Sequence, residues 1–351
     1  MNMKTPQLLL FLLASATLFA ASNLNAATTD PVGYITSELT AGADNFVTVP
    51  LKSAPDFTGS VSTATAQGVD MYVITLAGAV NFSDDVFNDT HYLRFLDNAG
   101  EGKHFAILDT LSNSLIIDSL GDDLSAVMLN DRVEVVRYWT LAQLFDPATQ
   151  ESLVVSTGNL PFQRGSQVLL PDLQGVGRNK APKNAFFITD TEWRRASDFS
   201  NADDVVLLPE SYIIVRQDSA AGVRKLIVSG TVPTEKLTAY IYQETVDNDT
   251  LLTHGRPNAM RLDQLGFGTE FSDSSGNLPF QRSDQLLVWF NPQGRNPAPD
   301  TTFFRVGGEW RRASDFSNAD DFLLESNTAF IVRKKGQGTA VTKTWKNSPT
   351  Y

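Results

Sequence analysis

The chain has no cysteine and only three histidines among its 351 residues. The lack of cysteine excludes a disulfide framework, a thiolate nucleophile and a cysteine-ligated metal site. The histidines, His91, His104 and His254, lie in different segments and at no metal-ligand spacing. His91 and His104 are expected on the two strands of one hairpin. Neither a G-x-S-x-G motif nor a P-loop is present, so no enzyme class is indicated.

Long hydrophobic runs are scarce as well. The longest, Leu8 to Ala21, follows Lys4 and precedes the small residues Ala26 and Ala27. It falls short of the roughly 20 residues that a membrane-spanning helix needs. The pattern predicts a signal peptide over residues 1–26, and therefore an exported protein. No later run is long enough to span a membrane, so no transmembrane segment is expected in the mature chain.

Charge is also low, at 19% of residues, and it is acidic, with 28 Lys and Arg against 40 Asp and Glu. This balance argues against a nucleic-acid partner, which would require a basic face. Hydrophobic residues make up 42% of the chain, enough for well-formed cores. The length predicts two or three domains.

Two internal repeats are clear. The thirteen residues EWRRASDFSNADD occur at Glu192–Asp204 and again, unchanged, at Glu309–Asp321. Upstream of each copy, GNLPFQR occurs at Gly158–Arg164 and at Gly276–Arg282. Self-similarity of this kind indicates two copies of one structural module. The identity of the two runs is also what a recent duplication would produce.

The local pattern is that of an all-β protein. Short β-branched or aromatic runs alternate with clusters of Gly, Asn, Asp and Pro. Only Leu141–Phe145 and Leu262–Gly266 suggest helix, each about one turn. The predicted strands include 46–49, 71–76, 92–96, 114–117, 132–138, 205–208, 212–216, 225–228, 285–290 and 329–332. We expect an N-terminal barrel-like β domain followed by two duplicated small antiparallel modules, each a barrel or a sandwich.

The chain is accordingly divided into five parts. They are a signal peptide at 1–26, an N-terminal β domain at 28–137, repeat module 1 at 138–236, a connecting strand at 237–254 and repeat module 2 at 255–351.

Several longer segments carry a family resemblance. They are TTDPVGYI at the mature start, GDDLSAVMLNDRVEVVRYWTL, the pattern DQLLV, GEWRR and FIVRK, and the terminal TWKNSPTY. Together they resemble an uncharacterised paralogous family of secreted all-β proteins, known mainly from verrucomicrobial bacteria. The resemblance implies a secreted or envelope-associated β-protein, with no catalytic residues to carry over.

The duplicated acidic loop is a candidate metal site. It gathers carboxylate, amide and hydroxyl oxygens, the hard donors that Ca²⁺ selects. The candidate ligands are Asp198, Asn201, Asp203 and Asp204 in the first copy, and Asp315, Asn318, Asp320 and Asp321 in the second. The alternative is a set of Asx turns, in which these side chains cap the backbone.

The duplicated Trp-Arg-Arg motif is a candidate ligand site. An exposed indole flanked by guanidinium groups stacks well on a sugar, and two copies would act together. The candidate residues are Trp193, Arg194 and Arg195, with Trp310, Arg311 and Arg312 in the second copy. The alternative buries each Trp in its module core and pairs the preceding Glu with an Arg.

These observations predict an exported, non-enzymatic binding or structural protein of the cell envelope or extracellular space. Its expected partner is a polysaccharide or an envelope protein, and periplasmic, surface and released locations stay open. The alternative is a carbohydrate-binding protein that uses the Trp-Arg-Arg loops; a weaker one is a glycoside-active enzyme. Exposure of the two indoles distinguishes the first two hypotheses, because buried indoles exclude sugar stacking.

Overall fold

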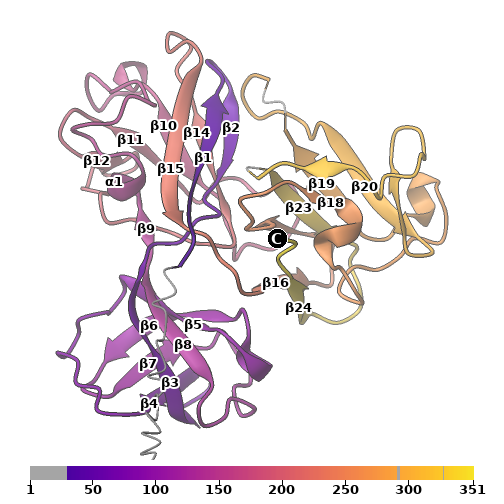
Figure 1. The fold of residues 1–351 in the computed structure, drawn as a ribbon. Helices are drawn as coiled ribbons and strands as arrows, with labels where there is room; N and C mark the ends of the chain where they lie inside the picture. The colour runs from indigo at the N-terminus through magenta and orange to yellow at the C-terminus, as the bar shows by residue number, and fades with distance from the viewer. Residues whose placement is uncertain (1–29, 291–292, 327) are drawn as a thin grey trace, which may run out of the picture. The chain divides into compact units, whose positions relative to one another are not determined.

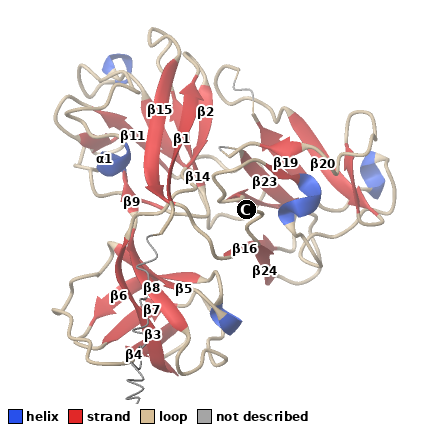
Figure 2. Ribbon diagram, viewed as in Figure 1, coloured by secondary structure: helices blue, strands red, loops and turns tan. Residues whose placement is uncertain are grey.

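The computed structural model describes residues 30–290, 293–326 and 328–351. Strands make up 41% of the described residues and helices 5%, so the predicted all-β class is confirmed (Figure 2). The one-turn helices were also anticipated: α1 spans Leu141–Leu144 and the 3-10 helix η3 spans Leu262–Leu265. Within the described residues, no helix is long and apolar enough to cross a membrane. The predicted signal peptide lies outside these residues.

Six strands form a closed antiparallel barrel in the order β3-β4-β7-β6-β5-β8 (Figure 1). Their bounds are β3 Pro55–Ala66, β4 Met71–Leu76, β5 His91–Phe95, β6 His104–Thr110, β7 Ser114–Asp118 and β8 Arg132–Arg137. The long strand β3 closes the barrel because it pairs with β8 through its first half and with β4 through its second. Leu93, Phe95, Phe105 and other apolar side chains fill the interior.

The first repeat is built on a five-stranded sheet in the order β12-β11-β10-β14-β2, with two smaller strand pairs, β1-β15 and β13-β9. The bounds are β1 Val32–Leu39, β2 Asp44–Thr48, β9 Trp139–Thr140, β10 Gln167–Leu170, β11 Asn184–Ile188, β12 Trp193–Arg195, β13 Val206–Leu207, β14 Tyr212–Arg216 and β15 Arg224–Thr231. One hydrophobic core unites the three strand groups.

The second repeat has the same plan, with the sheet β17-β23-β19-β20-β21 and the pairs β16-β24 and β18-β22. The bounds are β16 Leu237–Gln243, β17 Asn248–Thr253, β18 Met260–Arg261, β19 Gln285–Trp289, β20 Thr301–Val306, β21 Glu309–Arg312, β22 Leu323–Leu324, β23 Ala329–Lys334 and β24 Val341–Asn347. Its core is separate from the first.

Strand pairing groups the chain differently from the division drawn on sequence. Strands β1 and β2 precede the barrel, yet they pair with β15 and β14 of the first repeat. Strands β16 and β17, expected as a connection, pair with β24 and β23 and occupy the equivalent places in the second repeat. The barrel is therefore an insertion between the second and third strands of the first repeat.

A buried ion pair in the first repeat is completed by the second repeat. Arg216 on β14 donates to both carboxylate oxygens of Asp44 on β2, at 2.7 and 2.8 Å. Asn296, in the loop between β19 and β20, donates its backbone N–H to Asp44 at 2.8 Å. Its side-chain oxygen accepts from Arg216 at 3.2 Å. The loop of one repeat thus caps the sheet of the other.

A loop of the first repeat makes the equivalent contact with an ion pair of the second repeat. Arg333 on β23 donates to both oxygens of Asp249 on β17, at 2.7 and 2.8 Å. Asn179, between β10 and β11, donates its N–H to Asp249 at 2.7 Å and accepts from Arg333 at 2.8 Å. Between these two contacts Phe46, Tyr212, Trp289 and neighbouring apolar side chains form a shared cluster. The repeats therefore hold each other through a reciprocal contact.

Candidate functional site

The two indoles proposed to stack on a sugar lie inside the repeat cores. Trp193 is 0% exposed and Trp310 3% exposed. The indole N–H of Trp193 donates to the carbonyl of Phe145 at 2.9 Å, and Trp310 packs on Phe267 and Phe271. Each ring supplies the core with a large apolar surface. The interpretation of Trp193 and Trp310 as ligand-stacking residues is therefore wrong.

The flanking arginines are half-buried and engaged with the protein. Arg194 pairs with Glu192 at 2.7 Å and also donates to Asn159, while Arg311 pairs with Glu309 at 3.0 Å. Arg195 lies over the Phe186 ring and Arg312 over Phe322. These contacts match the alternative in which the motif stabilises the module.

The acidic loop forms Asx turns in both copies. Asp198 accepts from the N–H and hydroxyl of Ser200, and Asp203 accepts from the N–H of Trp193. Asn201 accepts from the N–H of Asp203. Asp315, Asp320 and Asn318 repeat these bonds in the second copy.

The remaining two candidates, Asp204 and Asp321, lie at the exposed end of the loop, where Asp321 pairs with Arg261. Within the described residues, no three His, Asp or Glu side chains lie close enough together to hold a metal ion. The hydrogen bonds therefore favour the Asx-turn alternative over a Ca²⁺ site at six of the eight candidate positions, all except Asp204 and Asp321.

In each repeat, GNLPFQR and the acidic segment form one continuous surface. Both segments are identical in the two repeats. In the first repeat, Arg164 of GNLPFQR donates to the carbonyl of Ala196 in the acidic segment. Its guanidinium lies over Phe187 and over Phe199, 4.9 and 5.9 Å from the ring centroids. The second repeat reproduces every contact, with Arg282, Ala313, Phe304 and Phe316.

Apolar side chains stand out on this surface. Phe162 is 82% exposed and its counterpart Phe280 76% exposed, and the neighbouring Leu160 and Leu278 are about half exposed. Each Phe sits on a 3-10 turn, η2 Pro161–Gln163 or η4 Pro279–Gln281. We call this the LPF surface: Leu160, Phe162, Arg164 and Phe199 in the first repeat, and Leu278, Phe280, Arg282 and Phe316 in the second.

The backbone at Phe199 and Phe316 is strained in the same way. Both residues have φ of 62°, in the left-handed region that a bulky side chain seldom adopts. The strain holds each ring at the surface beside its arginine. Strained residues of this kind concentrate at functional sites.

Several core positions differ between the repeats, while the LPF surface does not. The strand registers make three first-repeat core residues, Val168, Ile188 and Ile213, equivalent to Leu286, Arg305 and Phe330. A recent duplication would have left cores and surfaces equally identical. Surface loops normally vary faster than cores, yet these two exposed segments are unchanged in repeats that differ at some core positions. A constraint that acts on the surface itself would produce this identity.

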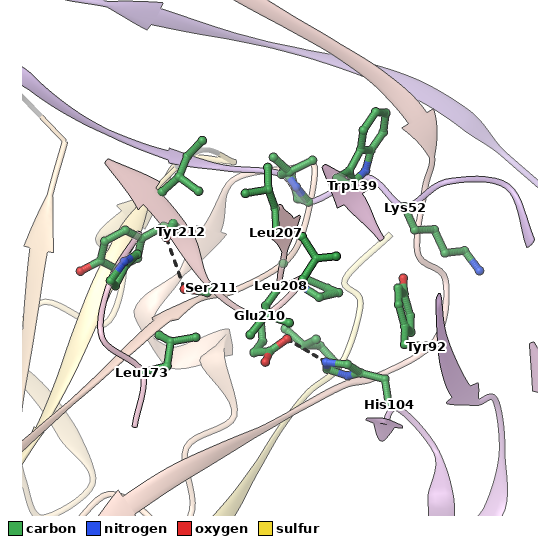
Figure 3. A pocket seen from close by; sticks show the side chains of 18 of the residues that line it. Lys52, Tyr92, His104, Trp139, Leu173, Leu207, Leu208, Glu210, Ser211 and Tyr212 are labelled. Carbon is green, nitrogen blue, oxygen red and sulfur yellow. Dashed lines mark hydrogen bonds and ion pairs between the residues drawn. The ribbon is translucent and has the colours of Figure 1, made fainter. Parts of the chain in front are cut away.

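A pocket with a volume of about 350 Å³ lies elsewhere in the described residues. The barrel contributes Tyr92 and His104, the first repeat contributes Trp139 and Glu210, and the second contributes Tyr242. Leu173, Leu207 and Leu208 give it apolar walls (Figure 3). Binding pockets combine an apolar lining with a few polar groups in this way.

Two of the residues that line the pocket, His104 and Glu210, are hydrogen-bonded to each other. His104 Nε2 is 2.7 Å from Glu210 Oε2 (Figure 3). Burial alone would raise the pKa of Glu210, but the charge and hydrogen bond of His104 outweigh it, and this pKa lies below its usual value. The carboxylate is therefore ionised at neutral pH, with His104 beside it.

The Tyr92 hydroxyl is a further polar group of the pocket. Its residue is 4% exposed, and no hydrogen bond from the hydroxyl to another described residue is present. Burial raises the pKa of Tyr92, which keeps the hydroxyl protonated. It is available as a donor to a ligand.

Sequence reasoning placed His91 and His104 on one hairpin, and the pairing of β5 with β6 confirms this. It missed the contact of His104 with Glu210, 106 residues along the chain. No sequence signal marks that contact, because it depends on how the barrel meets the first repeat. Comparisons of the chain with protein-family models, curated proteins and solved structures gave no match.

Proposed function

We propose that the protein is an exported, non-enzymatic binding protein that engages its partner through the two LPF surfaces. The observation that carries this proposal is the identity of the two exposed surfaces in repeats that differ at several core positions. Exposed Phe162 and Phe280 contribute nothing to a core, so stability does not account for their presence.

The chemistry of the surface favours a protein partner with an apolar groove. Each copy projects a phenylalanine and a leucine, with an arginine held beside them by aromatic contacts. Aromatic and arginine side chains dominate the binding energy of protein interfaces. A cell-envelope protein present in many copies would engage both surfaces at once, and the second contact would then form at a high effective concentration.

The test uses Phe162→Ser, Phe280→Ser and the double variant, with Ile227→Ser as the control. Ile227 is 65% exposed, lies outside the LPF surface and has Thr344 as its equivalent in the second repeat. Retention of each protein on isolated cell envelopes is measured across a concentration series. We expect each single variant to bind roughly 10- to 100-fold more weakly, the double variant not to bind, and the control to bind like the parent chain.

Treatment of the envelopes identifies the partner. Protease digestion should abolish retention, whereas periodate oxidation of sugars should leave it intact. The reverse result would assign the surfaces to a polysaccharide. A double variant that is retained like the parent chain would end the proposal. Melting curves of all variants should coincide, because the substituted side chains are exposed.

No observation favours a glycoside-active enzyme. Glycoside hydrolysis generally requires two carboxyl groups across one cleft. Among the described residues that line the pocket, Glu210 is the only acidic one, and it is paired with His104.

A further inference from the structure

The pocket reverses the charge balance of the chain. The whole sequence has 28 basic and 40 acidic residues, yet the pocket is lined by five basic residues and one acidic residue. The basic residues are Lys52, Arg94, Arg137, Lys183 and Arg256, and the acidic one is Glu210. We infer that this pocket binds a small amphipathic organic anion, with an apolar body and a carboxylate or similar head group.

The first reason to expect an anion in the pocket is the buried cation Arg256. It is 1% exposed, and its guanidinium donates to the carbonyls of Pro233, Glu235 and Asn347 and to the Asn347 side chain. The Tyr351 side chain also hydrogen-bonds to Arg256 and the charge of Glu235 acts on it, but no carboxylate among the described residues lies within ion-pair distance. A buried charge of this kind is costly unless a counter-charge is nearby. An anion in the pocket would provide one.

Of two further cations, Lys52 is closely paired and Arg94 is only partly neutralised. Lys52 donates to both oxygens of Glu134 at 2.5 Å. Arg94, which is 6% exposed, shares that carboxylate at 3.5 Å and approaches Glu235 at 3.4 Å. These are long ion-pair distances for a buried guanidinium. Two cations therefore depend on one close carboxylate and one distant one.

The pocket mouth adds exposed positive charge. Arg137 approaches Asp56 at only 3.9 Å, with both side chains about half exposed, and Lys183 is exposed. Such charges steer an anion toward the pocket. Glu210, the one acidic residue that lines the pocket, is hydrogen-bonded to His104.

The apolar lining accounts for the body of the ligand. Leu173, Leu207, Leu208 and Trp139 present hydrocarbon and ring surface (Figure 3). The Tyr92 hydroxyl, which has no hydrogen-bond partner among the described residues, can donate to an anionic head group. At about 350 Å³ the pocket is at the small end of the range for ligand sites, roughly 300–1,000 Å³. A short acyl or aromatic acid fits this size and polarity.

The probe is 8-anilinonaphthalene-1-sulfonate, an amphipathic anion whose fluorescence rises in an apolar site. Octanoate, 1-octanol and octylamine then compete for the full-length protein at pH 7. These three share one apolar chain and differ in charge. We expect octanoate to displace the dye roughly tenfold more effectively than 1-octanol, and octylamine to be weakest. Unchanged near-ultraviolet circular dichroism excludes dye binding to an expanded state.

Substitutions of pocket residues test whether the anion binds in this pocket. Arg137→Glu and Lys183→Glu change exposed residues and should each weaken octanoate binding several-fold, while Lys225→Glu, an exposed lysine on β15, should not. Leu208→Trp should fill the pocket and abolish dye binding. The inference is overturned if octylamine competes as well as octanoate, if the dye does not bind, or if Lys225→Glu has the same effect as the pocket variants. Binding through the LPF surfaces is unaffected by each of these outcomes, so the two proposals fail separately.

Discussion

At the scale of single residues, the two repeats have different side-chain pairs at one buried polar position. Ser166 hydrogen-bonds to Gln217 in the first repeat, and Asp284 forms an ion pair with Lys334 at the equivalent place in the second. All four side chains are fully buried. Both pairs bind equivalent backbone groups. Ser166 accepts from the N–H groups of Val154 and Asp218, as Asp284 does from those of Ser272 and Lys335. Gln217 donates to the carbonyl of Ser152, as Lys334 does to that of Glu270. A neutral pair can therefore replace the charged one.

We predict that Asp284→Ser alone destabilises the protein by about 3 to 5 kcal/mol, because it leaves Lys334 buried without a counter-charge. Adding Lys334→Gln should recover most of that loss, since the double variant reproduces the first repeat. Denaturant unfolding measures both free energies. A double variant no more stable than the single one would show that the two repeats do not share this geometry.

A second prediction concerns pH and His254. Burial, with the nearby charge of Arg256, lowers the pKa of His254 from 6.5 to about 4, and Nε2 donates to the carbonyl of Glu325 at 2.8 Å. Between pH 6.5 and 4 the unfolded chain binds a proton that the folded chain does not. Stability should therefore fall by about 3 kcal/mol across this window as the pH drops.

Unfolding midpoints measured from pH 7.5 to 4 check this expectation. His254→Gln should lower stability at pH 7 but flatten the decline, because glutamine does not titrate. If the variant and the parent chain lose stability with the same slope, another group is responsible.

At the scale of elements, the loops between β10 and β11 and between β19 and β20 depend on one residue each. Asn179 and Asn296 have φ of 51° and 50°, and their side-chain oxygens accept from Arg333 and Arg216. Asparagine tolerates this left-handed backbone better than most residues.

We predict that Asn179→Gly costs about 1 kcal/mol, through loss of the hydrogen bond to Arg333. Asn179→Ala should cost about 1 kcal/mol more, because alanine also resists positive φ. The same two substitutions of Asn296 should have the same effects on stability. Urea midpoints of the four variants make the comparison, and equal effects of Gly and Ala would mean that backbone conformation does not matter at these loops.

Local patterns predicted many of these elements. The strands at 71–76 and 212–216 have the bounds that their β-branched runs indicated, and α1 and η3 coincide with the two expected turns. The burial of Trp193 was one of two open alternatives, because a sequence does not show which face of a short strand is covered. The pairing of β2 with β14 was missed, since the two strands are separated by the whole barrel.

At the scale of the whole molecule, the second repeat shows what the first would be without its insertion. Strand β17 connects to β18 through residues 254–259, whereas the equivalent β2 and β9 are separated by residues 49–138. The fold class was predictable from the spacing of the strands. The insertion was not, because the short strand β2 shares only Asp44 and Thr48 with its equivalent β17, at Asp249 and Thr253. The pocket was equally hidden, since it needs residues from all three parts of the chain.

We predict that replacing residues 49–138 with the sequence of 254–259 gives a protein that still unfolds cooperatively, at a lower temperature. Both members of the Lys52–Glu134 pair are removed together, so no unpaired charge is left at that place. Envelope binding through the LPF surfaces should persist, whereas octanoate should no longer raise the melting temperature. A shortened chain that still responds to octanoate would place the anion site outside the barrel contact.

The reciprocal contact of the repeats has the geometry of a twofold-symmetric dimer joined into one chain. Each Asn loop meets an Arg–Asp pair on the opposite repeat, and the same set of bonds is made twice. A chain with a single repeat would satisfy these groups only by associating with a second copy of itself. This is the arrangement expected if an ancestral homodimer became a monomer through gene duplication and fusion. Once fused, one copy was free to accept a barrel that the other copy never acquired.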